Sequence, residues 1–124
     1  MEIVLDDQNS VLDIDTNYED SSCTKITAID VLDKTANQFA YLESIMRKIR
    51  YGGELILEGN DLDLIAREYY HSQNDISGIL YNGRYSISSL KNIAAFIEGS
   101  GFVVTSKRLS GHKYSLVARR PNAN

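Results

Sequence analysis

Four polar side chains follow two predicted strands, and they are the chain's strongest candidate for chemistry. Asp30 and Asp33 flank the end of one predicted strand. Asn60 and Asp61 follow the end of the next one. Open α/β sheets bind ligands at the carboxyl ends of their strands, so these side chains would share one rim, with Asn60 and Asp61 contacting a substrate or a partner. Asp33 and Asp61 are equally suited to capping the helices that follow them.

A second pair of carboxylates, Asp13 and Asp15, lies in the alternating segment VLDID. Carboxylates two residues apart in a strand lie on one side, and Mg²⁺ or Ca²⁺ takes such oxygen ligands. A solvated acidic face is the simpler interpretation. His71 and His112 lack the spacing of a metal site, and Cys23 has too few basic neighbours for a reactive thiolate. We therefore predict no metal ion and no catalytic residue.

Tyrosines bracket a segment without hydrophobic periodicity, residues 72–85. A connection of this length in a small domain is usually functional or poorly ordered. Tyr69, Tyr70, Tyr81 and Tyr85 could line an aromatic pocket or the rim of a protein interface, where tyrosine is common. We favour the interface and predict that Tyr81 and Tyr85 contact a substrate or a partner.

The segment from Thr35 to Glu58 positions the rim. Its apolar residues recur at spacings of three and four, on one stripe of a predicted helix: Phe39, Leu42, Ile45, Met46 and Ile49. Gly52 or Gly53 can adopt the left-handed conformation that ends a helix. The apolar run at 55–57 lacks alternation, which is typical of a strand covered on both faces. A helix joined to such a strand is half of a β-α-β unit.

Further elements complete an α/β pattern. Two more helices are predicted to begin near Asn60 or Asp61 and within 86–89. The predicted strands, besides that at 54–58, span 2–5, 11–15, 25–32, 102–108 and 112–120. A tight LSG connection makes the last two antiparallel, whereas right-handed crossovers make the centre parallel. We predict a three-layer α/β domain with a mostly parallel sheet and a C-terminal antiparallel hairpin.

The composition is that of one globular domain. The chain has 124 residues, 43% of them hydrophobic and 24% charged. No apolar run approaches the roughly 20 residues that cross a bilayer, so we expect no membrane partner. A single cysteine and an acidic N-terminus give no sign of export, and we expect a cytoplasmic protein. The net charge of −4 and the lack of a basic helix argue against nucleic acid as a partner.

Several segments resemble class I S-adenosylmethionine-dependent methyltransferases. The stretch IRYGGELILEGNDLDLIAREY is similar to the family's helix, GG turn and fifth strand. SSCTKITAIDVLDK resembles the fourth strand, and GFVVTSKRLSGHKYSLVARRP resembles the closing hairpin. The resemblance extends over residues 10–121. It implies that Asp13 matches an acid that contacts the cofactor adenine. Together with Asp30 and Asp33 at the strand ends, Asp13 is a candidate cofactor-binding residue.

Important features of that family are missing. Its cofactor loop is a glycine-rich turn after the first strand, and the sequence has no such turn. Too few residues precede Lys25 for the family's first three strands and their helices. The chain therefore resembles the second half of the fold, as one truncated domain over 1–124 with a divergent segment at 1–20. Lys34 stands where the family pattern has a histidine, which argues against a general base there.

Two functions follow from the resemblance. One is a methyltransferase-like binding or assembly subunit without catalysis, of a kind found in viral or phage genomes, which binds no cofactor alone. The alternative is an S-adenosylmethionine-dependent methyltransferase whose cofactor site a partner chain completes. A small-molecule carrier or regulator that uses residues 72–85 is a third option. Because exposed strand edges invite pairing, we expect a homo-oligomer or a larger assembly unless residues 1–20 cover the edge.

Overall fold

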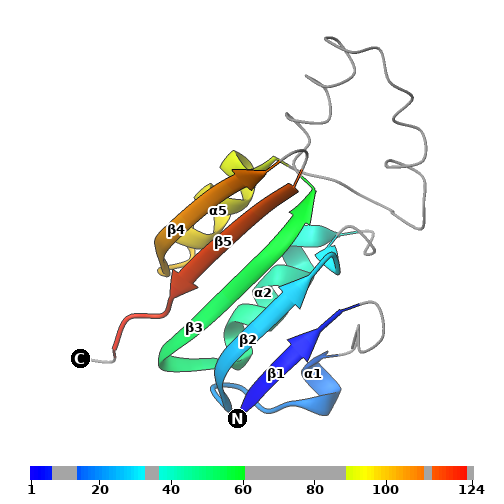
Figure 1. Ribbon diagram of the computed structural model, residues 1–124. Coiled ribbons are helices and arrows are strands. Elements are labelled where there is room, and N and C mark those ends of the chain that lie inside the picture. Colours follow the sequence, from blue (N-terminus) through cyan, green and yellow to red (C-terminus); the bar gives the residue numbers. More distant parts are fainter. Residues whose placement is uncertain (7–13, 33–36, 61–88, 111–112, 123–124) are drawn as a thin grey trace, which may run out of the picture.

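A five-stranded sheet forms the centre of the computed structural model (Figure 1). The structure describes residues 1–6, 14–32, 37–60, 89–110 and 113–122. The elements follow one another in the order β1 (Glu2–Leu5), α1 (Ile14–Asn17), β2 (Cys23–Ile29), α2 (Gln38–Lys48), β3 (Ile49–Asn60), α5 (Leu90–Gly99), β4 (Val103–Ser110) and β5 (Lys113–Arg119).

The sheet is parallel in its first part and antiparallel in its last. Its strands lie in the order β1-β2-β3-β5-β4. β1, β2 and β3 run parallel, and β5 runs antiparallel to both of its neighbours. The predicted α/β fold, with parallel centre and C-terminal antiparallel hairpin, is confirmed. β1 pairs with β2 in parallel. Part of the 1–20 segment therefore covers the edge of β2, as the sequence analysis allowed as an alternative to an oligomer.

Helix α2 ends before the glycine pair, and the prediction that the glycines close it is wrong. Its C-cap is Ile49, which has φ −82° and ψ 128° and already pairs with Cys23 as the first residue of β3. Residues 50–53 then lie opposite Thr24 alone, so β3 contains an irregular bulge of four residues against one. Gly52 has a φ of +81° within this bulge, where glycine avoids a steric penalty.

Arg120 holds the bulge in place. The N–H of Gly52 donates to the Arg120 carbonyl at 2.8 Å, and the N–H of Arg120 donates to the Gly53 carbonyl at 3.0 Å. The Arg120 guanidinium donates to the carbonyl of Ile49 at 2.7 Å and lies 3.9 Å from the centre of the Tyr51 ring. Backbone groups that leave the β2 ladder are therefore bonded to the C-terminal segment instead.

Some other element predictions change at their boundaries. The predicted strand at 11–15 is wrong in part, because Ile14–Asn17 forms the short helix α1. The predicted strand at 54–58 is the second half of the 12-residue β3. Helix α5 is capped by Ser89, as predicted, whereas the N-cap of α2 is Asn37. The helix predicted near Asn60 and the segment 72–85 lie outside the described residues.

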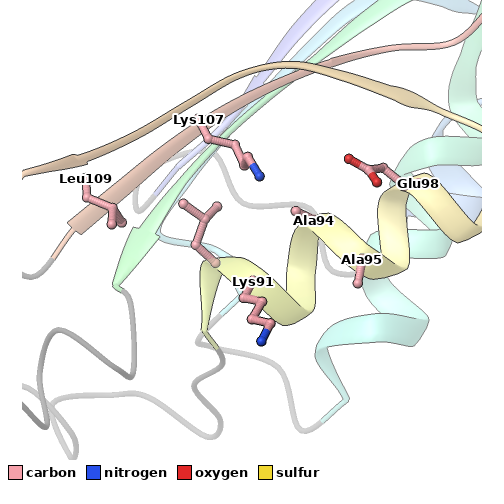
Figure 2. A pocket seen from close by; sticks show the side chains of 7 residues that line it. Lys91, Ala94, Ala95, Glu98, Lys107 and Leu109 are labelled. Atoms are coloured by element: carbon pink, nitrogen blue, oxygen red, sulfur yellow. The ribbon is translucent and has the colours of Figure 1, made fainter.

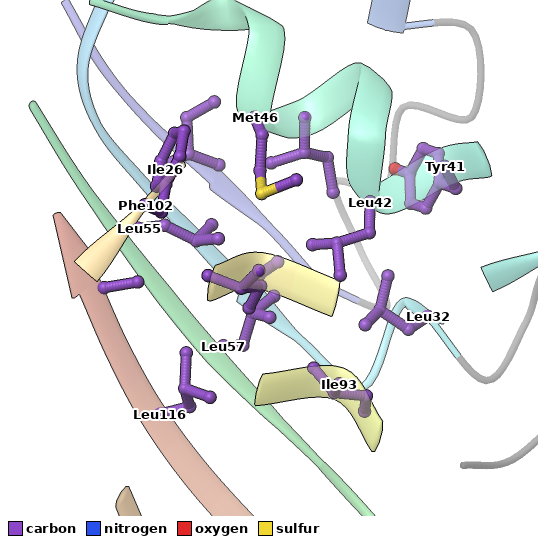
Figure 3. Packing of buried hydrophobic residues seen from close by; sticks show 14 of the residues in the cluster. Ile26, Leu32, Tyr41, Leu42, Met46, Leu55, Leu57, Ile93, Phe102 and Leu116 are labelled. Atoms are coloured by element: carbon purple, nitrogen blue, oxygen red, sulfur yellow. The ribbon is translucent and has the colours of Figure 1, made fainter. Parts of the chain in front are cut away.

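The hydrophobic core lies between one face of the sheet and the helices (Figure 3). Its fully buried large side chains come from every strand except β4 and from all three described helices: Leu5, Ile14, Ile26, Leu42, Ile45, Ile49, Leu55, Leu57, Ile93, Ile97 and Leu116. Phe39 of α2 and Phe96 of α5 meet with ring centroids 4.9 Å apart. Helices α2 and α5 therefore share one face, behind the sheet in Figure 1. In the part of the chain that the structure describes, no helix covers the opposite face.

An ion pair between a buried lysine and an exposed aspartate ties the end of α2 to the segment before β2. The Lys48 ammonium lies 2.6 Å from the Asp20 carboxylate, and only 4% of the lysine side chain is exposed. The N–H of Ser21 donates to the Arg47 carbonyl at 2.9 Å. The cation also lies in the last turn of α2, where it favours the negative end of the helix dipole. These contacts set where β2 begins relative to β3.

Gly53 occupies a position without room for a side chain. A Cβ there would lie 2.7 Å from Ile49 Cγ2, and 2.9 and 3.0 Å from the backbone oxygens of Arg50 and Thr24. We expect Gly53→Ala to lower the free energy of unfolding by about 1–3 kcal/mol, because it overpacks the bulge. Urea denaturation measures this. Gly99→Ala, whose new methyl meets nothing within 4 Å, is the control, and equal stabilities would contradict the prediction.

Tyr41 is a buried phenol of α2 in the core (Figure 3). Burial raises the pKa of Tyr41 from 10.0 to about 12. The folded state therefore holds this proton more tightly than the unfolded state, so its contribution to stability is complete below pH 10 and is lost as the pH rises towards 12. We expect Tyr41→Phe to make the alkaline decline in unfolding free energy shallower, as measured by denaturation at a series of pH values. Identical declines in both proteins would contradict this.

Candidate functional site

The carboxyl ends of β2 and β3 meet the start of β5 at one rim of the sheet. Asp30 directly follows β2, and Asn60 is the last residue of β3. Lys113, the first residue of β5, pairs with Asn60 in the antiparallel register. The rim forms because parallel strands bring their carboxyl ends together, and the antiparallel β5 brings its amino end to the same place.

Asp30 turns the chain sharply at this rim. Its φ is +56°, in the left-handed region that aspartate tolerates better than most residues. Its N–H donates to the Glu58 carbonyl at 2.9 Å, which continues the bonding between β2 and β3 by one residue. Val31 and Leu32 then enter the core. The strained backbone of Asp30 thus leaves its carboxylate above the strand ends while the chain turns inward.

The Asp30 carboxylate is engaged by Lys113. The Lys113 ammonium lies 3.1 and 3.3 Å from the two carboxylate oxygens. The side chain of Asp30 is 25% exposed and that of Lys113 is 51% exposed. A partly exposed ion pair of this kind contributes little to the free energy of folding. A polar ligand that used the carboxylate would have to displace or share the lysine.

The rest of the rim is closely packed. The side chain of Asn60 is fully buried. A Cβ atom on Gly59 would lie 2.9 Å from the hydroxyl oxygen of Tyr114. Because glycine has no Cβ, the phenol fits against the backbone here. Within the described residues, no group of three His, Cys, Asp or Glu side chains is arranged to hold a metal ion. The rim therefore offers hydrogen bonds and one ion pair.

The structure places two of the sequence-predicted site residues together, Asp30 and Asn60. Their roles in binding stay predictions. The remaining predicted residues lie outside the described part of the chain: Asp13, Asp33, Asp61, Tyr81 and Tyr85. Sequence reasoning missed Lys113. The signal was available, because a tight hairpin that returns beside β3 must bring its second strand's first residue to the end of β3.

A separate cavity of about 530 Å³ lies between α5 and β4 (Figure 2). Its walls combine apolar groups with three charged side chains, Lys91, Glu98 and Lys107. Leu109 at its edge is 54% exposed. Among the described residues, its lining contains no histidine or cysteine and a single carboxylate, so these residues offer binding contacts and no nucleophile with an adjacent base.

Comparison with known proteins gives matches in structure alone. No protein-family model and no curated protein matches the sequence. An O-methyltransferase family protein from Burkholderia thailandensis superposes with a TM-score of 0.69 at 16% identity, over 91% of this chain and 34% of that one. A chain in the Haloferax volcanii complex of the Trm112 methyltransferase activator with its methyltransferase partner gives a TM-score of 0.62 at 11% identity, over 85% and 57%.

This chain has a methyltransferase-like fold. The cyclase SpnF also superposes on it, with a TM-score of 0.67 at 12% identity, over 92% of this chain and 55% of SpnF. At identities of 11–16% the likeness concerns the fold alone. The chain spans about a third to three fifths of the length of these three proteins. None of the described helices is long and apolar enough to cross a lipid bilayer.

The ion pair at the rim can be measured with a double-mutant cycle. We expect Asp30→Asn and Lys113→Met to show a coupling of about 0.2–1 kcal/mol in unfolding free energy, which salt reduces because the pair is half exposed. Lys107→Met combined with Asp30→Asn is the control. Lys107 lies on β4, three strands away from β2, which Asp30 follows, so the effects of these two substitutions should add without coupling. Equal couplings in both cycles would contradict a specific pair.

Proposed function

We propose that this methyltransferase-like chain is a binding subunit that does not transfer methyl groups by itself. The observation that carries the proposal is the connection from β1 to β2. Residues 6–22 contain no glycine, and the first glycine of the chain is Gly52. Every residue of that connection carries a side chain, which keeps the backbone from the close approach to a ligand that glycine allows. The methyltransferase resemblance implies a glycine-rich cofactor turn after the first strand.

The state of the rim supports the same proposal. Of the three predicted cofactor-binding residues, Asp30 lies in the described part of the chain, and its carboxylate is bonded to Lys113. A cofactor that needs this carboxylate must compete with an intramolecular cation. The Asp30 carboxylate has an ammonium group as its partner, which stabilises the charged form and does not make it a stronger nucleophile or base, and the amide of Asn60 has neither role. The geometry thus gives the carboxylate an intramolecular partner at a partly exposed position.

Calorimetric titration with S-adenosylmethionine tests the proposal. We expect no binding heat up to about 1 mM ligand, the concentration that corresponds to a free energy of roughly −4 kcal/mol. Micromolar binding by this chain alone would overturn the proposal. Lys113→Met serves as the matched variant, because it frees the Asp30 carboxylate. If Lys113 merely blocks an intact site, this variant binds the cofactor and the proposal also fails.

A second candidate function is an S-adenosylmethionine-dependent methyltransferase completed by a partner chain. The Haloferax volcanii complex, in which a methyltransferase is bound to an activator, favours this candidate. In such a complex Asp30 would orient the methyl acceptor at the strand ends, close to the buried Asn60, and this orientation would supply much of the rate. Binding of the cofactor by a copurified complex, weakened by Asp30→Asn and absent from the free chain, would support this second function over the first.

A further inference from the structure

The face of the sheet opposite α2 and α5 carries two ordered rows of side chains. Strand register and the alternation of burial define them, because the intervening residues of each strand point into the core. The first row is charged and consists of Glu2, Lys25, Glu54 and Arg119. The second row is β-branched and consists of Val4, Thr27, Ile56 and Val117.

These rows are accessible in the part of the chain that the structure describes. The side chain of Val4 is 46% exposed, and Glu2 and Arg119 at the two ends of the charged row are also exposed. Ile56 and Val117 are half-buried by their own neighbours. Parallel strands occur almost only in sheets that are covered on both faces. A row of β-branched side chains over parallel strands therefore indicates a surface that another layer covers.

We propose that a second copy of this chain covers this face, with its twofold axis parallel to the strands and midway between β2 and β3. The charged row reads minus, plus, minus, plus from β1 to β5. Such an axis reverses the order of the strands, so β1 faces β5 of the second copy and β2 faces β3. Glu2 then lies opposite Arg119, and Lys25 lies opposite Glu54. All four facing pairs have opposite charge.

The second row obeys the same symmetry. Val4 lies opposite Val117 of the second copy, and Thr27 lies opposite Ile56. Each contact joins two β-branched side chains, which interdigitate well between packed sheets. Strands related by this axis run in the same direction, which is the aligned mode of sheet packing, with a mean angle of about −30° and a separation of about 10 Å.

The alternative twofold axis, perpendicular to the strands, is less favourable. It keeps every strand opposite its own copy and exchanges the residues on either side of the β-branched row. Glu54 would then lie opposite Glu58, a repulsive pair of like charges in β3. The row of alternating charges is therefore complementary to itself in the first arrangement and not in the second. The inference does not depend on whether the chain binds S-adenosylmethionine.

The size of the face predicts a weak dimer. Four strands about 4.8 Å apart, each contributing about six residues that rise about 3.3 Å, cover an area on the order of 20 by 20 Å. Interfaces of this size belong to transient complexes. We therefore expect a dissociation constant in the micromolar range or above, so association should be visible only at high protein concentration.

Sedimentation equilibrium of charge-reversal variants tests the proposal. Glu2 and Arg119 lie three strands apart within one chain, too far to touch, and meet only in the dimer. We expect wild type to dimerise, and Glu2→Arg alone or Arg119→Glu alone to raise the dissociation constant at least about tenfold. An equal mixture of the two variants should dimerise about as well as wild type, because each facing pair is again of opposite charge. Loss of folding cannot produce this rescue.

Matched variants on the helix side complete the experiment. Glu43→Arg and Lys91→Glu make the same two changes in net charge at exposed positions of α2 and α5, and both should dimerise like wild type. A wild type that stays monomeric near 1 mM would overturn the proposal and leave the face to a different protein, because even a millimolar constant is detectable there. Dimers that ignore both reversals, or a mixture that is not rescued, would also overturn it.

Discussion

The structure depends on the parallel pairing of β2 with β3 above an apolar core. Ile26 lies beside Leu55 and Ala28 beside Leu57, and all four are buried against the helices. This pairing determines where α2 can cross, because the helix must return the chain to the start of the neighbouring strand. It also brings the carboxyl ends of both strands to one rim. The apolar contacts beneath the strands provide the free energy that holds this arrangement.

The antiparallel β5 has two consequences for function. By pairing with β3 it places Lys113 at the carboxyl rim, where the ammonium engages Asp30. By extending the sheet it also places Arg119 at the far end of the charged row. One strand thus supplies both the cation that pairs with Asp30 at the candidate site and the last residue of the charged row. A methyltransferase-like fold does not by itself imply methyl transfer, since the cyclase SpnF has a similar fold.

Sequence reasoning succeeded where the signal was local and failed where two local signals conflicted. The β-branched run of β2, the Ser89 cap of α5 and the closing hairpin were predicted because each is encoded by adjacent residues. Ile49 was assigned to the helical stripe, yet it is an equally good strand residue, and its pairing with Cys23 decides the matter. The glycines looked like a helix end, but Arg120, distant in sequence, holds them in a bulge. At the rim, the sequence analysis found Asp30 and Asn60 and missed Lys113, although the closing hairpin pointed to it.

The amino-acid sequence by itself determined the α/β class and the approximate places of the main strands along the chain, since hydrophobic periodicity and turn residues act over a few neighbouring positions. Only the tertiary structure decided which charges lie side by side. Glu2 and Arg119 share a row although the whole length of the chain separates them, because that row exists only once four strands are in register. Register depends on the summed packing of the core, and no short segment contains that information.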